Sequence, residues 1–188
     1  MTLATAPVPG PATTITGAPL PVVALPQGEL LTVDTNDMPL VRDALGDGVH
    51  FKPLRLDIEN GEWVVLATFA PGARIPMHYH TGVVDAWTMS GSWHYVEYAD
   101  QPQTAGSYLF EPVASVHTLE CPATNTEDTV VLFRVSGANV NFTEDGQFHS
   151  VLDAAMIVHL TGQLAEAQQL GPLNYISGGA AGFNAEAH

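Results

Sequence analysis

Most of the chain consists of short segments in which apolar and polar residues alternate, separated by turn residues such as Glu59-Asn60-Gly61 and Ser90-Gly91-Ser92. A period of two is typical of β-strands with one buried face, and many short strands at this spacing predict a sandwich or barrel. A further strand is expected through the segment that contains His78 and His80. The other expected strands are Leu30–Val33, His50–Asp57, Glu62–Ala70, Val84–Met89, Trp93–Tyr98, Ser107–Phe110, Val116–Glu120, Thr129–Val135 and Asn139–Phe142.

A helical period occurs only between Asp153 and Leu170, where Met156, Leu160, Leu164 and Ala167 recur at intervals of three or four. Asp153 is the expected N-cap, and Gly171 ends the helix. Six prolines lie in residues 1–28, where they oppose both helix and sheet interiors. We therefore predict one domain with four parts: a proline-rich, extended or disordered arm (1–28), a β-barrel (29–150), a helix (151–171) and a flexible tail (172–188).

Histidines mark the candidate chemistry. His78 and His80 are two apart in a predicted strand, so their side chains share one face while Tyr79 points the other way. Imidazole is the commonest neutral protein ligand of zinc, iron, copper and nickel. His117, in the strand Val116–Glu120, supplies a third ligand if the two strands face each other. His94 falls on the face opposite Trp93 and Tyr95, which predicts that it is not a ligand.

The spacing of these residues resembles the two motifs of the cupin superfamily. The first segment reads Gly72-x5-His78-x-His80-x4-Asp85-x5-Gly91, and the second reads Gly106-x5-Pro112-x-Ala114-x2-His117-x3-Cys121. The chain departs from the family pattern in having Asp85 for Glu, Ala114 for Gly, Cys121 for Asn, and one residue fewer at the end of the first motif. The resemblance implies an all-β, double-stranded β-helix (jelly-roll) barrel in which His78, His80 and His117 hold a metal ion.

Within the cupins, HYHTG and AWTMSGSWHYVEY resemble the branch of the 2,4′-dihydroxyacetophenone dioxygenases, with acetylacetone dioxygenase and ChrR-type anti-sigma factors as more distant relatives. The resemblance implies Fe(II) as the metal, with Zn, Mn or Ni as other candidates, and Glu97 as a ligand or nearby base. The expected reaction is cleavage of a C–C bond of a small aromatic or apolar hydroxyketone or diketone by O2, giving carboxylic acids.

Three carboxylates are candidates for a metal ligand or for the general base: Glu97, Asp85 and Glu111. Asp85 stands where cupins carry Glu but is one methylene shorter, Glu97 shares a face with Trp93 and Tyr95, and Glu111 precedes Pro112. For each, a solvated surface position is the alternative. Aromatic residues expected to line a substrate slot, or else to belong to the barrel core, are Trp87, Trp93, Tyr95, Tyr108 and Phe110.

Charge and composition exclude some kinds of binding partner and favour one cellular compartment. Twenty Asp and Glu against five Lys and Arg give a formal charge of −15, which opposes binding to nucleic acid or anionic membranes. The single cysteine, the absence of Lys or Arg before Arg42 and the lack of a long apolar run favour a cytoplasmic protein. A homodimer or homotetramer is expected.

Two other functions stay open: a cupin enzyme of different chemistry (isomerase, lyase or another oxygenase) and a metal-binding sensor without catalysis. A ChrR-type sensor would need a separate helical domain, for which the residues before Leu45 are too rich in proline.

Overall fold

The computed structural model describes residues 10–24 and 31–178. Within the proline-rich segment, β1 (Gly10–Thr13) and β2 (Pro19–Ala24) form an antiparallel hairpin, and β2 is exposed throughout. Residues 1–9 and 25–28 of that segment lie outside the described residues, as do residues 179–188 of the expected tail. The hairpin belongs to a different compact unit from the barrel, which begins at Val33.

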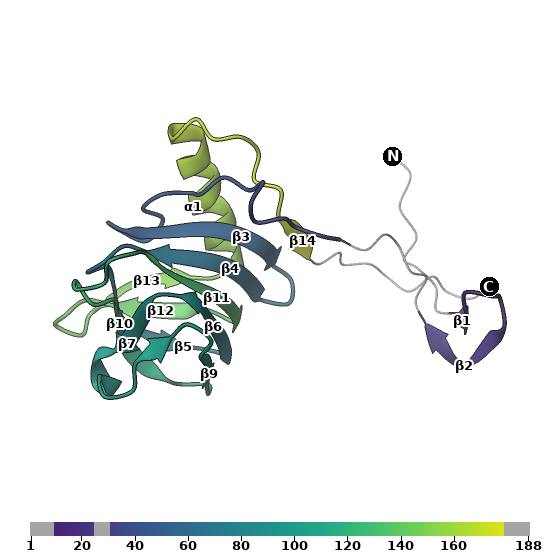
Figure 1. Ribbon diagram of the computed structural model, residues 1–188, viewed down its shortest axis with the longest axis horizontal. Coiled ribbons are helices and arrows are strands. Elements are labelled where there is room, and N and C mark those ends of the chain that lie inside the picture. The colour runs from purple at the N-terminus through teal and green to yellow at the C-terminus, as the bar shows by residue number, and fades with distance from the viewer. Residues whose placement is uncertain (1–9, 25–30, 179–188) are drawn as a thin grey trace. The chain divides into compact units, whose positions relative to one another are not determined.

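The barrel consists of two six-stranded sheets that face each other (Figure 1). In order, the first sheet contains β14 (Ile176–Gly178), β3 (Val49–Asp57), β4 (Glu62–Phe69), β11 (Thr129–Ser136), β6 (Val84–Ser90) and β9 (Tyr108–Glu111). The second contains β13 (Phe148–Leu152), β12 (Asn139–Phe142), β5 (Arg74–His80), β10 (Val116–Glu120), β7 (Ser92–Tyr95) and β8 (Gln103–Thr104). The all-β class predicted from the alternating pattern is confirmed.

The core fills the space between the sheets because the strands bury alternate residues. In β4, for example, Trp63, Val65, Ala67 and Phe69 are buried and the residues between them are half-exposed. This alternation assigns each side chain of the barrel to an inner or an outer face. Whether a residue has an odd or an even position in its strand (its parity) therefore decides whether its side chain reaches the interior.

The predicted C-terminal helix is present as α1 (Ala154–Ala167), and the Asp153 side chain accepts a hydrogen bond from the Met156 amide at 2.8 Å. The helix packs against β3 and β13 (Figure 1). Its buried residues are Ala154, Ile157 and Thr161, whereas Met156, which we expected to be apolar core, is exposed. The helix is thus rotated relative to the expected face. No described helix has the length and apolarity needed to cross a membrane.

Several segments differ from the sequence-based expectation: β8 and β13 lie where no strand was expected, and α1 ends at Ala167 although Gly171 was the expected end. Residues 31–33 of the expected strand Leu30–Val33 are not in a strand, and Leu30 lies outside the described residues. The expected strand Trp93–Tyr98 ends at Tyr95 and continues as the 3-10 turn η1 (Val96–Tyr98). The segment expected to be a flexible tail contributes β14, which pairs in parallel with β3 and thereby extends the first sheet.

Two turn positions in the cupin-like motifs have left-handed backbone conformations. Gly91 has φ +76°, and a Cβ built on it would lie 2.7 Å from the Thr129 Cα, so this turn requires glycine. Ala114 has φ +71° although it carries a Cβ. The turn with Ala114 is nevertheless held in place, because the Ala114 amide donates to the His80 carbonyl at 3.0 Å and the His80 amide donates to the Ser115 carbonyl at 3.1 Å.

Candidate metal centre

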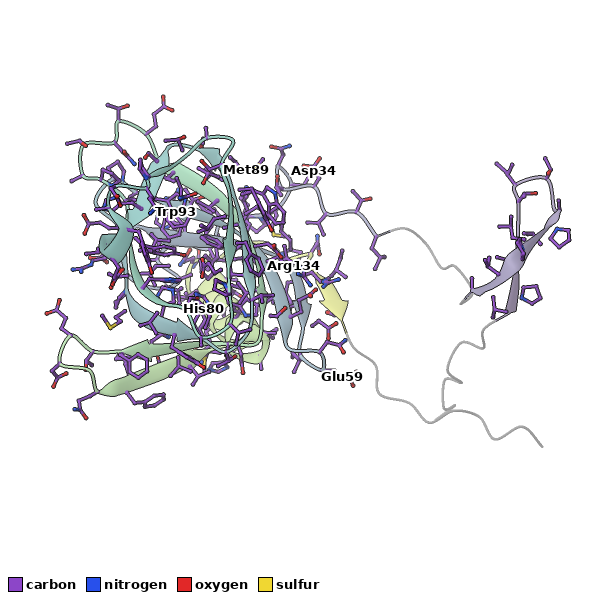
Figure 2. All side chains as sticks on the ribbon, turned by 90° about the horizontal axis from the view of Figure 1, so that it is seen from below. Asp34, Glu59, His80, Met89, Trp93 and Arg134 are labelled. Atoms are coloured by element: carbon purple, nitrogen blue, oxygen red, sulfur yellow. The ribbon has the colours of Figure 1, made fainter. Side chains whose placement is uncertain are left out.

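Three histidines converge inside the barrel. His78 and His80 project inward from β5, and His117 lies on β10 directly opposite His78 in the strand register. All three are buried, and their ligand nitrogens lie within 4.8 Å of one another. Figure 2 shows His80 among the strands of the barrel. The alternation of β5 and the pairing of β5 with β10 are together sufficient to assemble this cluster.

Glu111 completes the cluster from the other sheet. Its Oε2 lies 3.0 Å from the His80 Nε2 and 3.1 Å from the His117 Nε2, and its side chain is buried. Burial alone would raise the pKa of Glu111, but the two imidazoles beside it hold that pKa well below its usual range. The carboxylate is therefore charged.

Tyr95 fixes the other oxygen of this carboxylate. Its hydroxyl donates to the Glu111 Oε1, and its ring stacks on the His117 imidazole with the ring centroids 3.7 Å apart. Burial and the neighbouring Glu111 charge raise the pKa of Tyr95 well above its usual value, so the phenol stays protonated and remains a donor. Tyr95 thus holds two members of the cluster at once.

His78 is oriented by the backbone. Its Nδ1 lies 2.8 Å from the Pro76 carbonyl oxygen, which can only accept, so Nδ1 carries the proton and the Nε2 lone pair is free. Burial, followed by the neighbouring His80, lowers the pKa of His78 to about 4. A neutral imidazole with a free lone pair is the form that binds a metal ion.

The donor set fits a divalent metal. Three imidazole nitrogens and one carboxylate oxygen meet at a buried point, and the Glu111 Oε2 accepts no well-aligned hydrogen bond there. A buried carboxylate without a cation is unfavourable, and no Lys or Arg is among the described residues that line the site. Nitrogen and oxygen donors suit Fe(II), Mn, Ni and Zn alike.

The cluster opens onto a small, mostly apolar cavity with a volume of about 30 Å³. Asn139 is the polar group that lines it apart from the cluster and Tyr95; it lies opposite His80 in the pairing of β12 with β5. Its Oδ1 is buried and has no hydrogen-bond partner in the described part of the chain. The apolar lining comprises Leu45, Phe51, Trp63, Val65, Ala67, Phe69, Ile75, Leu119, Phe133, Val135 and Leu152.

Asp85 lies on the outer face of its sheet, away from the histidines. Its Oδ2 is 3.0 Å from the Arg134 Nη1, and its Oδ1 accepts from the Tyr108 hydroxyl at 2.5 Å. The neighbours Val84 and Ala86 occupy the inner positions of β6 and are buried. Asp85 is away from the cluster because its position in β6 points its side chain outward. The fact that Asp is one methylene shorter than Glu is not the reason.

Glu97 also differs from its expected position. Because β7 ends at Tyr95, the alternation that would have placed Glu97 beside Trp93 and Tyr95 does not extend to it. Glu97 is exposed in η1, and its Oε2 accepts from the Thr118 amide at 2.9 Å. The structure brings Glu111, and neither Glu97 nor Asp85, into the cluster.

The five aromatic candidates separate into three groups. Tyr95 lines the cavity. Trp93 is fully buried in the core, where its Nε1 donates to the Thr88 Oγ1 at 2.9 Å. Trp87, Tyr108 and Phe110 face outward, and each is between 39% and 53% exposed. The cavity is lined instead by Phe51, Trp63, Phe69 and Phe133, which the sequence reasoning did not single out.

Among the residues that the structure describes, no other histidine joins the cluster. His94 is half-buried on the face of β7 opposite Trp93 and Tyr95, as expected from the alternation. The Nδ1 of His50 accepts from the Asp43 amide at 2.9 Å, and the Nδ1 of His149 lies 2.8 Å from the Ser150 hydroxyl. Cys121 is a buried thiol whose pKa is raised to about 11 by burial.

One signal could have identified Glu111 from the sequence. Glu111 and Leu109 share a parity in β9, and Tyr108 and Phe110 share the other. Tyr108 and Phe110 are expected from the sequence to line a slot or to belong to the core, because rings are usually buried. Asn139 gave a weaker signal, since a single polar residue in a strand is usually solvated.

Comparison with known proteins identifies a protein family whose model matches this chain. Residues 29–140 match the family model of the ChrR cupin-like domain. No curated protein matches the chain. A solved protein of unknown function with a cupin-like fold, from Ralstonia eutropha JMP134, is 42% identical, with 85% of this chain and 98% of that one covered and a TM-score of 0.79.

Two further solved structures share the fold. An RmlC-like cupin from the same Ralstonia strain is 26% identical, covers 77% of this chain and 92% of its own, and has a TM-score of 0.70. An acetylacetone dioxygenase from Acinetobacter johnsonii is 15% identical, covers 74% of this chain and 94% of its own, and has a TM-score of 0.62. At 15% identity, the likeness to the dioxygenase shows a common fold and nothing about its activity.

Proposed function

This chain belongs to the ChrR cupin-like domain family of the cupin superfamily, and on that premise we propose that it is a metal-dependent dioxygenase. Its substrate would be a hydroxyketone or diketone, whose C–C bond is cleaved with O2. The observation that carries the proposal is the buried set of three histidines and one glutamate, placed at the end of an apolar cavity. A set that served structure alone would not need a cavity beside it.

Fe(II) is the proposed metal, held by His78, His80 and His117 with the Glu111 carboxylate beside it, and Zn, Mn or Ni are alternatives. When bound, it would supply Lewis acidity toward the substrate carbonyl and the redox capacity needed to react with O2. The three neutral imidazoles and the single carboxylate leave part of a 2+ charge uncompensated. This favours an anionic, enolised ketone in the cavity.

Glu111 is the proposed base for the proton α to the carbonyl. It is the carboxylate inside the barrel, because Asp85 points outward and Glu97 is exposed. Tyr95 donates to the Glu111 Oε1 and keeps the other oxygen directed into the cluster. This arrangement limits the rotation of the carboxylate and holds its free oxygen at one position.

The cavity sets the substrate class. Its lining of phenylalanine, tryptophan and aliphatic side chains favours a small apolar group. Because the volume is about 30 Å³, an aromatic group would enter only if these side chains move apart. Asn139 would hydrogen-bond a hydroxyl or carbonyl of the substrate, which satisfies its buried amide. For a 2-hydroxyketone, the reaction R–CO–CH2OH + O2 gives R–COOH and HCOOH, with the carbons oxidised and O2 reduced.

A metal-binding sensor without catalysis is the second candidate. It is favoured by the family model, which is named for the cupin-like domain of ChrR. The two candidates differ in one measurable property: a sensor binds the metal but consumes no O2 with any ketone.

The test begins with metal analysis of protein purified without added metal. The protein is then loaded anaerobically with Fe(II), and O2 uptake is followed with 2,4′-dihydroxyacetophenone and with acetylacetone as probes. We expect O2 consumption in equal amount to the cleaved substrate, and its loss in His117→Ala. Full occupancy by zinc together with no O2 uptake after iron loading would contradict the dioxygenase and favour the sensor.

A further inference from the structure

Two polar residues, Asn139 and Ser115, flank His80 on the inner face of the second sheet. Asn139 lies directly opposite His80 in the register of β12 with β5. On the other side, the register of β10 with β5 places Ser115, which directly precedes β10, opposite His80. Because directly paired residues project to the same face of a sheet, both side chains point to the same side as the His80 imidazole.

A β-bulge fixes the position of Ser115. Two residues, Ala114 and Ser115, oppose the single residue His80, since the Ala114 amide donates to the His80 carbonyl at 3.0 Å and the His80 amide donates to the Ser115 carbonyl at 3.1 Å. The first residue of such a bulge is left-handed, and Ala114 has φ +71°. Bulges beside active sites re-aim side chains. The backbone here holds Ser115 next to His80 even though Ala114 carries a Cβ.

His80 and Ser115 each have a buried polar atom without a hydrogen-bond partner in residues 10–24 and 31–178: the His80 Nδ1 and the Ser115 Oγ. The other ring nitrogen of His80, Nε2, faces the cluster and lies 3.0 Å from the Glu111 Oε2. A neutral imidazole that binds a metal ion through Nε2 carries its proton on Nδ1. His80 then has a buried N–H donor that needs an acceptor.

Asn139 and Ser115 differ in what can reach them. Asn139 lines the cavity, so a substrate can hydrogen-bond its amide, whereas Ser115 is not among the described residues that line it. The Cβ atoms of directly opposite residues are about 4.5–5.5 Å apart. The serine Oγ is one bond from its Cβ and the imidazole Nδ1 is two bonds from its own. The two unpartnered atoms are therefore within reach of each other or of one bridging water.

We propose that Ser115 is a positioning residue of the metal centre: its hydroxyl accepts the His80 Nδ1–H, directly or through one water molecule. A serine hydroxyl turns about a single bond and can accept, so it meets the imidazole that the metal has fixed. The Pro76 carbonyl has the same task at His78, whose Nδ1 lies 2.8 Å from it. Both histidines of β5 are then held with the Nε2 lone pair toward the metal. This inference rests on the proposed metal site but not on the reaction with O2.

The zinc affinity of the full chain, measured by competition with a chelator, tests the proposal without any turnover. Ser115→Ala removes the acceptor and should weaken zinc binding about tenfold to a hundredfold. Ser115→Thr keeps a hydroxyl at this position and should stay within about threefold of the native affinity. Ser136→Ala is the matched control, because Ser136 is also half-buried but lies on β11 of the other sheet, and it should leave the affinity unchanged. Far-UV circular dichroism checks that each variant is folded.

Nuclear magnetic resonance of the zinc-loaded native protein adds a readout that needs no variant. The His80 Nδ1–H should exchange slowly with water, as expected of a buried, hydrogen-bonded proton. The Nδ1–H of His78 is the internal reference, because its acceptor is the Pro76 carbonyl. In Ser115→Ala the His80 proton should exchange at least about tenfold faster, and the His78 proton should be unchanged.

The outcomes separate this inference from the proposed function. Weaker zinc binding by Ser115→Ala in a protein that consumes no O2 would support the role of Ser115 and contradict the dioxygenase alone. Equal zinc affinity in the native protein and Ser115→Ala, or a fast-exchanging His80 proton in the native protein, would overturn the role of Ser115 alone. Loss of zinc in Asn139→Ala but not in Ser115→Ala would overturn it in favour of Asn139. A native protein that binds neither zinc nor Fe(II) would overturn both.

Discussion

Glu111 and Asp85 lie on adjacent strands of one sheet and face opposite sides of it. Glu111 faces inward, between two imidazoles and the Tyr95 hydroxyl, in a region without Lys or Arg among the described lining residues. Asp85 faces outward and is held by Arg134 and Tyr108. No Lys or Arg among the described residues that line the site contacts Glu111, whereas Arg134 contacts Asp85.

This difference shows how the sheet separates two kinds of polar site. The outer carboxylate is neutralised within the protein by Arg134. The inner carboxylate lies between two imidazoles with no Lys or Arg among the described lining residues, an arrangement that suits a bound metal ion. Parity along β6 and β9 decides which carboxylate belongs to which site.

The largest effect is expected from removing an inner histidine. His117→Ala should lose most of the bound metal, because it removes one of the three converging nitrogens. His94→Ala, on the opposite face of β7, should retain full metal content. Metal content per chain after identical purification is the measurement, and equal retention by both variants would remove His117 from the site.

The two carboxylates give the second comparison. Glu111→Gln removes the charge within the cluster while keeping its shape, and we expect metal affinity to fall about a hundredfold. Asp85→Asn should change metal affinity less than about threefold, since its partner is Arg134. Competition with a chelator of known affinity measures both. An equal loss in the two variants would contradict the separation of inner and outer sites.

A pH dependence of stability is expected from the buried imidazole of His78, whose pKa is lowered from 6.5 to about 4. Between these values the unfolded chain binds the proton that the folded chain excludes, so acid favours unfolding. Stability of the metal-free protein should be complete above pH 6.5 and fall by about 3 kcal/mol as the pH approaches 4. Denaturant unfolding at several pH values measures this. His78→Asn should flatten the profile, and His94→Asn should leave it unchanged.

Asn139 is expected to affect substrate use without affecting the metal. Asn139→Ala should lower kcat/KM about tenfold, the equivalent of one hydrogen bond, and leave metal content at the native level. Asn141→Ala is the control, because the Asn141 amide already donates to the Ser150 hydroxyl. A parallel loss of metal in Asn139→Ala would instead indicate that Asn139 supports His80.

The smallest effect concerns the turn that connects the two strands of the site. Ala114 lies between Glu111 and His117 with φ +71°, a conformation that disfavours a Cβ. Ala114→Gly should raise the free energy of unfolding by up to about 1 kcal/mol. Thermal unfolding measures the change, with Ala86→Gly, a buried position in β6, expected to destabilise.

The sequence by itself determined most of the barrel strands, the helix with its Asp153 cap and the three histidines. Each of these rests on local periodicity or on spacing within one or two strands: His78 and His80 share a face because they are two apart, whatever the rest of the chain does. The turn at Ser90-Gly91-Ser92 is predicted in the same way, because glycine adopts the positive φ of +76° without strain.

Only the tertiary structure decided which carboxylate meets the histidines and which aromatic residues face the cavity. Asp85, Glu97 and Glu111 are equally polar in the sequence, but a strand that ends three residues early removes Glu97. The pairing of β6 with β9 turns Asp85 outward and Glu111 inward. The same pairing places Trp87, Tyr108 and Phe110 outside. The reason is physical: alternation fixes which residues share a face, while the packing of the second sheet decides which face is the interior.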